Sequence, residues 1–211
     1  PSPFPFSRAP SIVVSCDTQN EYRFLILGVG GAGKTCVLES LKTRFSLMPG
    51  LTPAQIVPTV GLNLARLEVP AESATATTTC VFWDLGGARG LREIWERYYA
   101  ECDGVLFVMD AAAAEESDES EETQTAVLRS VLADSRLRGA PALVLVNKAD
   151  AVTDTRADAT AKRCEAALVA AGTRRHRVEK TVGMSGRGLD RGVDWLVGAT
   201  DGPSLDALKA A

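Results

Sequence analysis

One stretch near the start of the chain constrains its fold more than any other. Phe24-Leu-Ile-Leu27 is a short apolar run without alternation, and Gly28-Val-Gly-Gly-Ala-Gly-Lys-Thr35 follows it directly. Strands that are buried on both faces of a parallel sheet have this character. The residues after Thr35, to position 45, favour a helix. The stretch therefore predicts a buried strand, a glycine-rich turn and a helix in immediate succession.

The turn matches the pattern G-x-x-x-x-G-K-[S/T] in the setting which that pattern requires. Glycines let successive backbone N–H groups surround phosphate oxygens, and a helix N-terminus adds partial positive charge. Lys34 is predicted to reach the β- and γ-phosphates, and the Thr35 hydroxyl to ligate Mg²⁺. An incidental Lys-Thr pair in a plain glycine-rich turn is the alternative, and the flanking strand and helix disfavour it.

The rest of the chain continues to alternate strand and helix. Apolar runs at 105–109 and 142–146 predict two further buried strands, and the stretches 121–133 and 160–170 predict helices. Alternation of this kind favours a parallel sheet with right-handed crossovers. Residues 61–69 and 77–83 are rich in strand formers and predict an antiparallel hairpin.

Composition limits the function classes. A chain of 211 residues fits one domain, and a net charge of −4 argues against nucleic acid as a partner. No apolar run approaches the roughly 20 residues that span a bilayer. The five cysteines are scattered without a Cys-x-x-Cys pair, so neither a zinc site nor a disulfide framework is predicted. We expect an irregular segment at 1–20, a folded domain at 21–200 and a tail at 201–211.

A second motif identifies the base. The strand at 142–146 leads into Asn147-Lys-Ala-Asp150. A carboxylate there accepts hydrogen bonds from N1–H and the exocyclic amine of guanine, a donor pair that adenine lacks. An ATP-dependent phosphotransferase would leave this motif unexplained. The Gly183 N–H, in Val182-Gly-Met-Ser185, is the expected third contact with the base.

The chain resembles the Ras-like small GTPases, and more closely their Arf and Arf-like branch. Pro58-Thr-Val-Gly-Leu-Asn63 resembles the first switch of that branch, and Trp83-Asp-Leu-Gly-Gly87 with Ile94-Trp-Glu-Arg-Tyr-Tyr99 resembles the second switch and the helix after it. The likeness runs from about Tyr22 to Val197. Segments such as Lys42-Thr-Arg-Phe45 are most similar to the Arf-related subgroup of the trans-Golgi.

The resemblance implies a three-layer P-loop GTPase fold: a mostly parallel six-stranded sheet with one antiparallel edge hairpin and helices on both faces. It implies GTP or GDP with Mg²⁺ as cofactors, with Thr35, Thr59 and, through a water, Asp84 at the metal. The implied nucleotide-binding residues are Gly28, Val29, Gly30, Gly31, Ala32, Gly33, Lys34, Thr35, Cys36, Thr59, Gly87, Asn147, Lys148, Asp150 and Gly183.

The resemblance also implies partners and a location. An exchange factor, an activating protein and effectors would contact the switches, with effectors at Leu62, Trp83 and Tyr98; plain packing of Leu62 and Trp83 explains their apolar character equally well. The implied place is the cytoplasm, with peripheral association on Golgi membranes and recruitment of effectors in vesicle traffic. In this branch the hairpin slides in register on GTP binding and expels an N-terminal amphipathic helix. The prolines within residues 1–16 exclude one continuous helix there.

Two positions depart from the family pattern. Ala88 stands where a glutamine orients the attacking water, so no catalytic residue is assigned and we expect weak intrinsic GTP hydrolysis. Gly30 stands where the branch usually has aspartate. A regulatory switch and a binding scaffold that no longer cycles both remain open, and the retained Thr35, Thr59 and Asp84 favour the switch.

Two surface features receive plainer interpretations. The segment 111–124 is acidic and lacks aromatic residues, and a solvated loop leading into a helix explains it better than a site for a basic partner. His176, the single histidine, is expected in a solvated basic turn before the last strand, in preference to a contact with an acidic partner, and receives no catalytic role.

Overall fold

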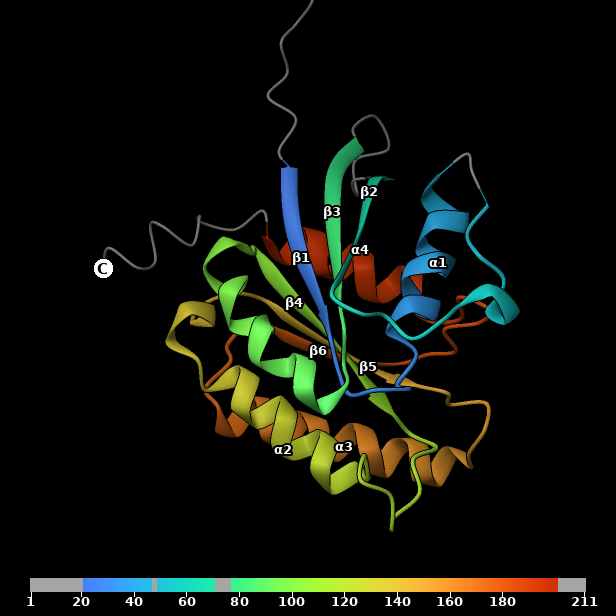
Figure 1. The fold of residues 1–211 in the computed structure, drawn as a ribbon. Helices are drawn as coiled ribbons and strands as arrows, with labels where there is room; N and C mark the ends of the chain where they lie inside the picture. The colour runs from blue at the N-terminus through green and yellow to red at the C-terminus, as the bar shows by residue number, and fades with distance from the viewer. Residues whose placement is uncertain (1–20, 47–48, 71–76, 201–211) are drawn as a thin grey trace, which may run out of the picture.

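A computed structural model describes residues 21–46, 49–70 and 77–200 of the chain. The expected segments 1–20 and 201–211 and the link between the hairpin strands at 71–76 lie outside the described residues. Figure 1 shows a central sheet flanked by helices. Its strands are β1 (Glu21–Leu27), β2 (Leu62–Pro70), β3 (Thr77–Leu85), β4 (Gly104–Asp110), β5 (Ala142–Asn147) and β6 (His176–Lys180).

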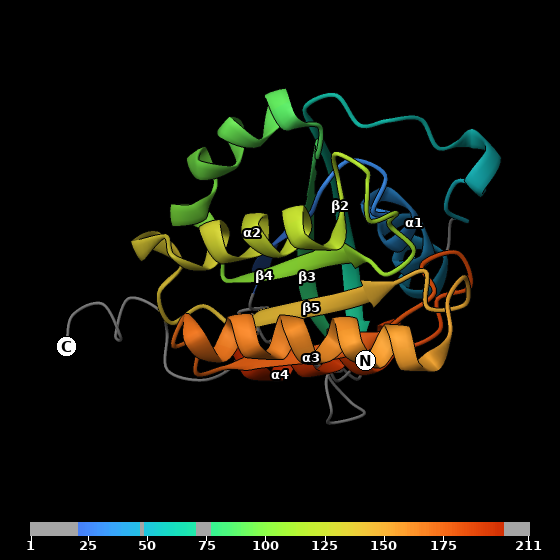
Figure 2. The ribbon, with the colours of Figure 1, turned by 90° about the horizontal axis from the view of Figure 1, so that it is seen from below.

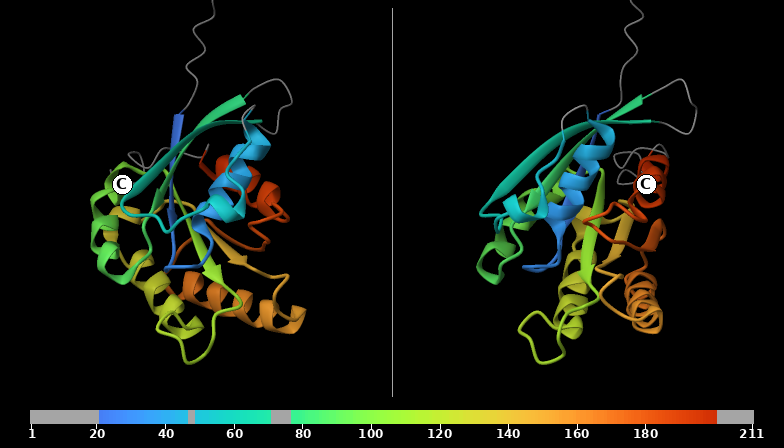
Figure 3. Two further views of the ribbon diagram at one scale, coloured as in Figure 1. Left: turned by 45° about the vertical axis from the view of Figure 1, so that its right-hand side comes forward. Right: turned by 90° about the vertical axis from the view of Figure 1, so that its right-hand side faces the viewer.

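The sheet has the predicted six strands in the order β2-β3-β1-β4-β5-β6. Only β2 and β3 pair antiparallel, with Leu62 opposite Leu85 and Pro70 opposite Thr77, whereas the other neighbours are parallel. The predicted hairpin is therefore confirmed, and it forms one edge of the sheet (Figure 3).

Four α-helices lie in the described part of the chain: α1 (Lys34–Phe45), α2 (Glu121–Leu132), α3 (Asp154–Ala170) and α4 (Leu189–Thr200). One apolar cluster joins α1 and α4 to one face of the sheet, and a second joins α2 and α3 to the other. Figure 2 looks onto the side covered by α2 and α3. The alternate residues of β1 explain both layers, since Phe24 and Ile26 belong to the first cluster and Leu25 and Leu27 to the second.

Three expectations about elements need correction. The helix expected at 160–170 begins at Asp154, because Thr153 caps it by accepting a hydrogen bond from the Arg156 N–H. The segment after the second switch forms 3₁₀ turns at Arg89–Arg97 in place of an α-helix. His176 begins β6 and is half-buried, so it does not lie in a solvated turn.

The segment 111–120 is a loop that leads into α2, as expected. Ser120 caps this helix by accepting from the Thr123 N–H. Within the described residues, no helix combines the length and the apolar character that crossing a membrane requires.

Candidate functional site

The glycine-rich turn joins β1 to α1 at the edge where the parallel strands end. Gly28 has a φ of 142°, and a side chain there would collide with the Val108 carbonyl of β4. Gly33 precedes α1 with a φ of 96°, and no described side chain caps this helix. The first N–H groups of α1 are therefore available to an anion.

Lys34 lies inside this turn with 6% of its surface exposed. Its Nζ donates a hydrogen bond to the Val29 carbonyl at 2.8 Å, so the side chain folds back over the loop. Burial lowers the pKa of Lys34 to about 8, and the nearby Asp84 carboxylate opposes that shift. A phosphate beside Nζ would favour the charged form.

Three oxygens gather where the magnesium ion is predicted. Thr35 Oγ1 lies 2.7 Å from Asp84 Oδ2 and 2.9 Å from Thr59 Oγ1. Burial raises the pKa of Asp84, and the Thr35 hydrogen bond is the strongest of the contacts that oppose the shift. Asp84 Oδ1 is buried without a hydrogen-bond partner among the described residues. Hydroxyl and carboxylate oxygens with an unsatisfied acceptor fit a hydrated Mg²⁺.

The turn after β3 closes against the glycine-rich turn. The Gly86 N–H donates to the Gly61 carbonyl at 2.9 Å. Gly87 packs so tightly against Gly28, Val29 and the Lys34 amine that a Cβ atom has no room. Gly87, one of the residues expected to bind the nucleotide, therefore lies over the phosphate loop.

Ala88 is exposed next to this turn. A Cβ placed on Gly30 would lie 3.9 Å from the Ala88 backbone, so the two positions face each other. Neither carries a polar side chain, and the one at Ala88 is a methyl group. These two facing positions therefore offer a water molecule no side-chain amide or carboxylate.

Asn147 connects the predicted base site to the phosphate loop. Its Nδ2 donates to the Ala32 carbonyl at 2.9 Å, and its Oδ1 accepts from the Gly183 N–H at 2.7 Å. The same Gly183 N–H is expected to reach guanine, so a contact with the base requires this bond to be shared. Asp150 is exposed, and no described residue donates a hydrogen bond to its carboxylate.

Lys148 adopts a left-handed backbone with a φ of 59°. Its Nζ forms an ion pair with Asp110 Oδ2 at 2.7 Å, at the end of β4. This contact fixes the direction of the Lys148 side chain, one of the residues expected to bind the nucleotide. Sequence reasoning missed Asp110, although its place at the end of a buried strand is a usable signal.

The three expected effector residues lie close to one another along the hairpin and the following turn. Trp83 and Tyr98 form an edge-to-face pair with ring centroids 5.4 Å apart. Leu62 is 37% exposed on β2, two residues before Leu64, which pairs with Trp83 and is 55% exposed. Partial exposure is compatible with both a packing and a contact role.

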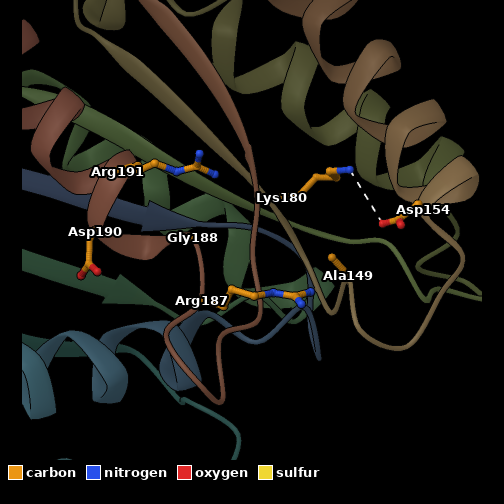
Figure 4. A pocket seen from close by; sticks show the side chains of 7 residues that line it. All are labelled: Ala149, Asp154, Lys180, Arg187, Gly188, Asp190 and Arg191. Atoms are coloured by element: carbon orange, nitrogen blue, oxygen red, sulfur yellow. Dashed lines mark ion pairs between the residues drawn. The ribbon is translucent and has the colours of Figure 1, made fainter.

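A hollow of about 470 Å³ lies beside Ala149 of the base loop, the segment 147–150 (Figure 4). Its cations are mostly neutralised within the chain, since Lys180 pairs with Asp158 and Asp154, and Arg191 pairs with Glu179. It is lined by Ala149, Asp154, Lys180, Arg187, Gly188, Asp190 and Arg191. The hollow therefore adjoins Ala149 of the base loop, and two of its three lining cations, Lys180 and Arg191, are paired within the chain.

Comparisons with known proteins identify the family of the chain. Residues 10–200 match the profile of Arf, the ADP-ribosylation factor family. The ADP-ribosylation factor-related protein 1 of Rattus norvegicus is 35% identical over 180 residues, which cover 85% of each chain. The ADP-ribosylation factor-like protein 3 of Saccharomyces cerevisiae is 32% identical over 179 residues, again 85% of each.

A solved structure shares the fold. The Arl6 BBS3 small GTPase from Trypanosoma brucei, with bound nucleotide analogue GppNp, superimposes with a TM-score of 0.66 at 23% identity. The alignment covers 86% of this chain and 98% of that one. The order of motifs, the sheet topology and the family match lead to one conclusion: the chain belongs to the ADP-ribosylation factor family of small GTPases.

Proposed function

We propose that the chain is an Arf-like molecular switch that binds GTP and GDP with Mg²⁺ and recruits effectors in Golgi and vesicle traffic. The observation that carries the proposal is the convergence of Thr35, Thr59 and Asp84 beneath a glycine-rich turn. When bound, Mg²⁺ would neutralise phosphate charge. Thr35 and Thr59 would hold it directly and Asp84 through a water.

The remaining contacts support guanine nucleotides. Asp150 offers a carboxylate to which no described residue donates a hydrogen bond, and Asn147 fixes the base loop against the phosphate loop. Gly87 lies where a γ-phosphate would approach, so its N–H would distinguish GTP from GDP. The traffic role follows the family membership and the trans-Golgi subgroup that the sequence resembles.

Hydrolysis is the weak part of this switch. Ala88 and Gly30 face each other without a side-chain amide or carboxylate. An activating protein can supply an arginine worth on the order of 10³ to 10⁵ in rate. A scaffold that holds GTP without cycling is the second candidate, and the methyl group at Ala88 is the observation that favours it.

Binding can be tested with fluorescent GDP and a non-hydrolysable GTP analogue, with ATP as competitor. We expect both guanine nucleotides to bind, an excess of ATP to leave them bound, and chelation of Mg²⁺ to accelerate their release. Displacement by ATP at similar concentration would contradict the base assignment. Release that does not depend on Mg²⁺ would contradict the metal site.

A further inference from the structure

Arg92 connects the second switch to a distant loop. It lies in the 3₁₀ turns after β3, and its Nε donates to the Gly87 carbonyl at 2.9 Å. Its Nη2 forms an ion pair and hydrogen bond with Glu119, at the end of the acidic loop. One planar guanidinium thus holds both a switch carbonyl and a carboxylate from another part of the chain.

The pair is partly shielded from water. The side chain of Arg92 is 15% exposed and that of Glu119 is 29% exposed. Removing one partner therefore leaves a partly buried charge near the phosphate loop.

Glu119 is held by Gln124 of α2, which in turn bonds the end of β4. Its backbone carbonyl accepts from Gln124 Nε2 at 3.0 Å, and the fully buried Gln124 accepts from the Asp110 N–H at 2.7 Å. Asp110 in turn pairs with Lys148 of the base motif. A chain of polar contacts therefore runs from the base loop through the acidic loop to Gly87.

The neighbouring carbonyl, that of Gly86, is held by a different side chain. Trp95 Nε1 donates to the Gly86 carbonyl at 2.9 Å, from the same 3₁₀ turns as Arg92. Trp95 is 2% exposed and belongs to the apolar core beneath α2 and α3, whereas Arg92 depends on its partner carboxylate for orientation. Trp95 therefore holds the peptide that carries the Gly87 N–H, and Arg92, oriented by the Glu119 carboxylate, holds the next peptide, so the backbone conformation of Gly87 depends on both anchors.

We propose that Arg92 is a positioning residue for GTP recognition and that Glu119 acts through it. Together they would hold the Gly87–Ala88 peptide and so keep Gly87 in the backbone conformation in which its N–H, on the preceding peptide that Trp95 holds, meets the γ-phosphate. This inference rests on the proposed function. Because GDP has no γ-phosphate, the pair matters for GTP and little for GDP, a difference that general stabilisation of the fold would not produce.

The test measures the ratio of affinities for a non-hydrolysable GTP analogue and for GDP on the full chain. We expect Arg92→Gln to lower this ratio about tenfold, the effect of losing one charge-assisted hydrogen bond. Glu119→Gln should lower the affinity ratio only about threefold, because this carboxylate is more exposed to water and its ion pair with Arg92 is correspondingly weaker. The double variant should equal Arg92→Gln alone, because Glu119 acts only through Arg92.

Two matched controls come from the same segments. Arg97→Gln changes an exposed arginine of the 3₁₀ turns, and Glu116→Gln changes an exposed carboxylate of the acidic loop. Both should keep the wild-type ratio. An unchanged ratio in Arg92→Gln, an equal loss for both nucleotides, or multiplicative effects in the double variant would each overturn the inference.

The two proposals fail in different ways. If the wild-type chain binds no guanine nucleotide, the proposed function fails and this inference falls with it. If the wild type binds both nucleotides and the variants keep its ratio, only this inference fails. Should Arg92→Gln not fold, Glu119→Gln alone decides, since it lies in a surface loop and an unchanged ratio there also overturns the inference.

Discussion

At the scale of single residues, the residues for nucleotide binding differ from those on which GTP hydrolysis depends. Among the residues predicted to hold phosphate and metal, Lys34 folds over the loop and Thr35 donates a hydrogen bond to Asp84. Ala88 and Gly30, which face each other, lack the polar groups that hydrolysis uses. A chain with these features should bind GTP well and hydrolyse it slowly.

Placing a side-chain amide at position 88 should therefore accelerate intrinsic GTP hydrolysis. Ala88→Gln is expected to accelerate single-turnover hydrolysis of preloaded GTP by roughly tenfold to a hundredfold, because positioned polar groups contribute on that scale. Ala88→Met, which has similar bulk and no amide, should remain slow. Equal rates in all three proteins would show that the missing amide does not limit hydrolysis.

The base preference should depend on one carboxylate. Asp150→Asn removes the acceptor of two guanine donors and should reduce the preference for GTP over ATP on the order of a hundredfold. Competition against fluorescent GDP measures this. Asp154→Asn, at a carboxylate that is 96% exposed on α3, should keep the preference. An unchanged preference in Asp150→Asn would refute the base assignment.

At the scale of elements, the apolar pattern of the sequence predicted the buried strands, but it missed the polar first turns of helix α3. The continuous apolar runs identified β1, β4 and β5, because both faces of these strands are covered. The first turn and a half of α3 is polar, so only its cap at Thr153 marks the start. The 3₁₀ turns at Arg89–Arg97 depend on tertiary contacts such as Trp95 with Gly86, which a sequence pattern does not reveal.

His176 also acquires its role from the packing of elements. It begins β6, and its Nε2 lies 2.8 Å from Glu165 of α3. Burial lowers the pKa of His176, but the hydrogen bonds with the Thr173 carbonyl and Glu165 outweigh it, so the pKa is raised overall. The pair therefore joins α3 to β6 most strongly when the imidazole is charged.

This pair should make stability depend on pH. Because the folded-state pKa is above the unfolded one, the stabilisation is present below the unfolded pKa and is lost as pH rises through the folded pKa. Urea unfolding should show wild type more stable than His176→Gln by up to about 1 kcal/mol near pH 5.5, and by less near pH 8.5. A difference in the free energy of unfolding between wild type and His176→Gln that grows toward high pH would contradict this account.

At the scale of the whole molecule, the site lies where strand ends from distant segments meet. The turns after β1, β3 and β5 each contribute one motif, so their order along the sequence was enough to predict the fold and most of the candidate site. The contacts among them were not predictable. Glu119 reaches Arg92 across 27 positions, and Asn147 reaches Ala32 across 115. Such pairings depend on loop paths that no local pattern specifies.

The most direct test of the central claim is the identity of the nucleotide that the protein carries. The chain would be purified from cells, denatured, and its released nucleotide identified by chromatography. We predict about one guanine nucleotide per chain, since these sites hold one ligand each. GTP in excess would indicate slow turnover at Ala88, and GDP would indicate a switch that completes its cycle. An adenine nucleotide, or none, would contradict the account.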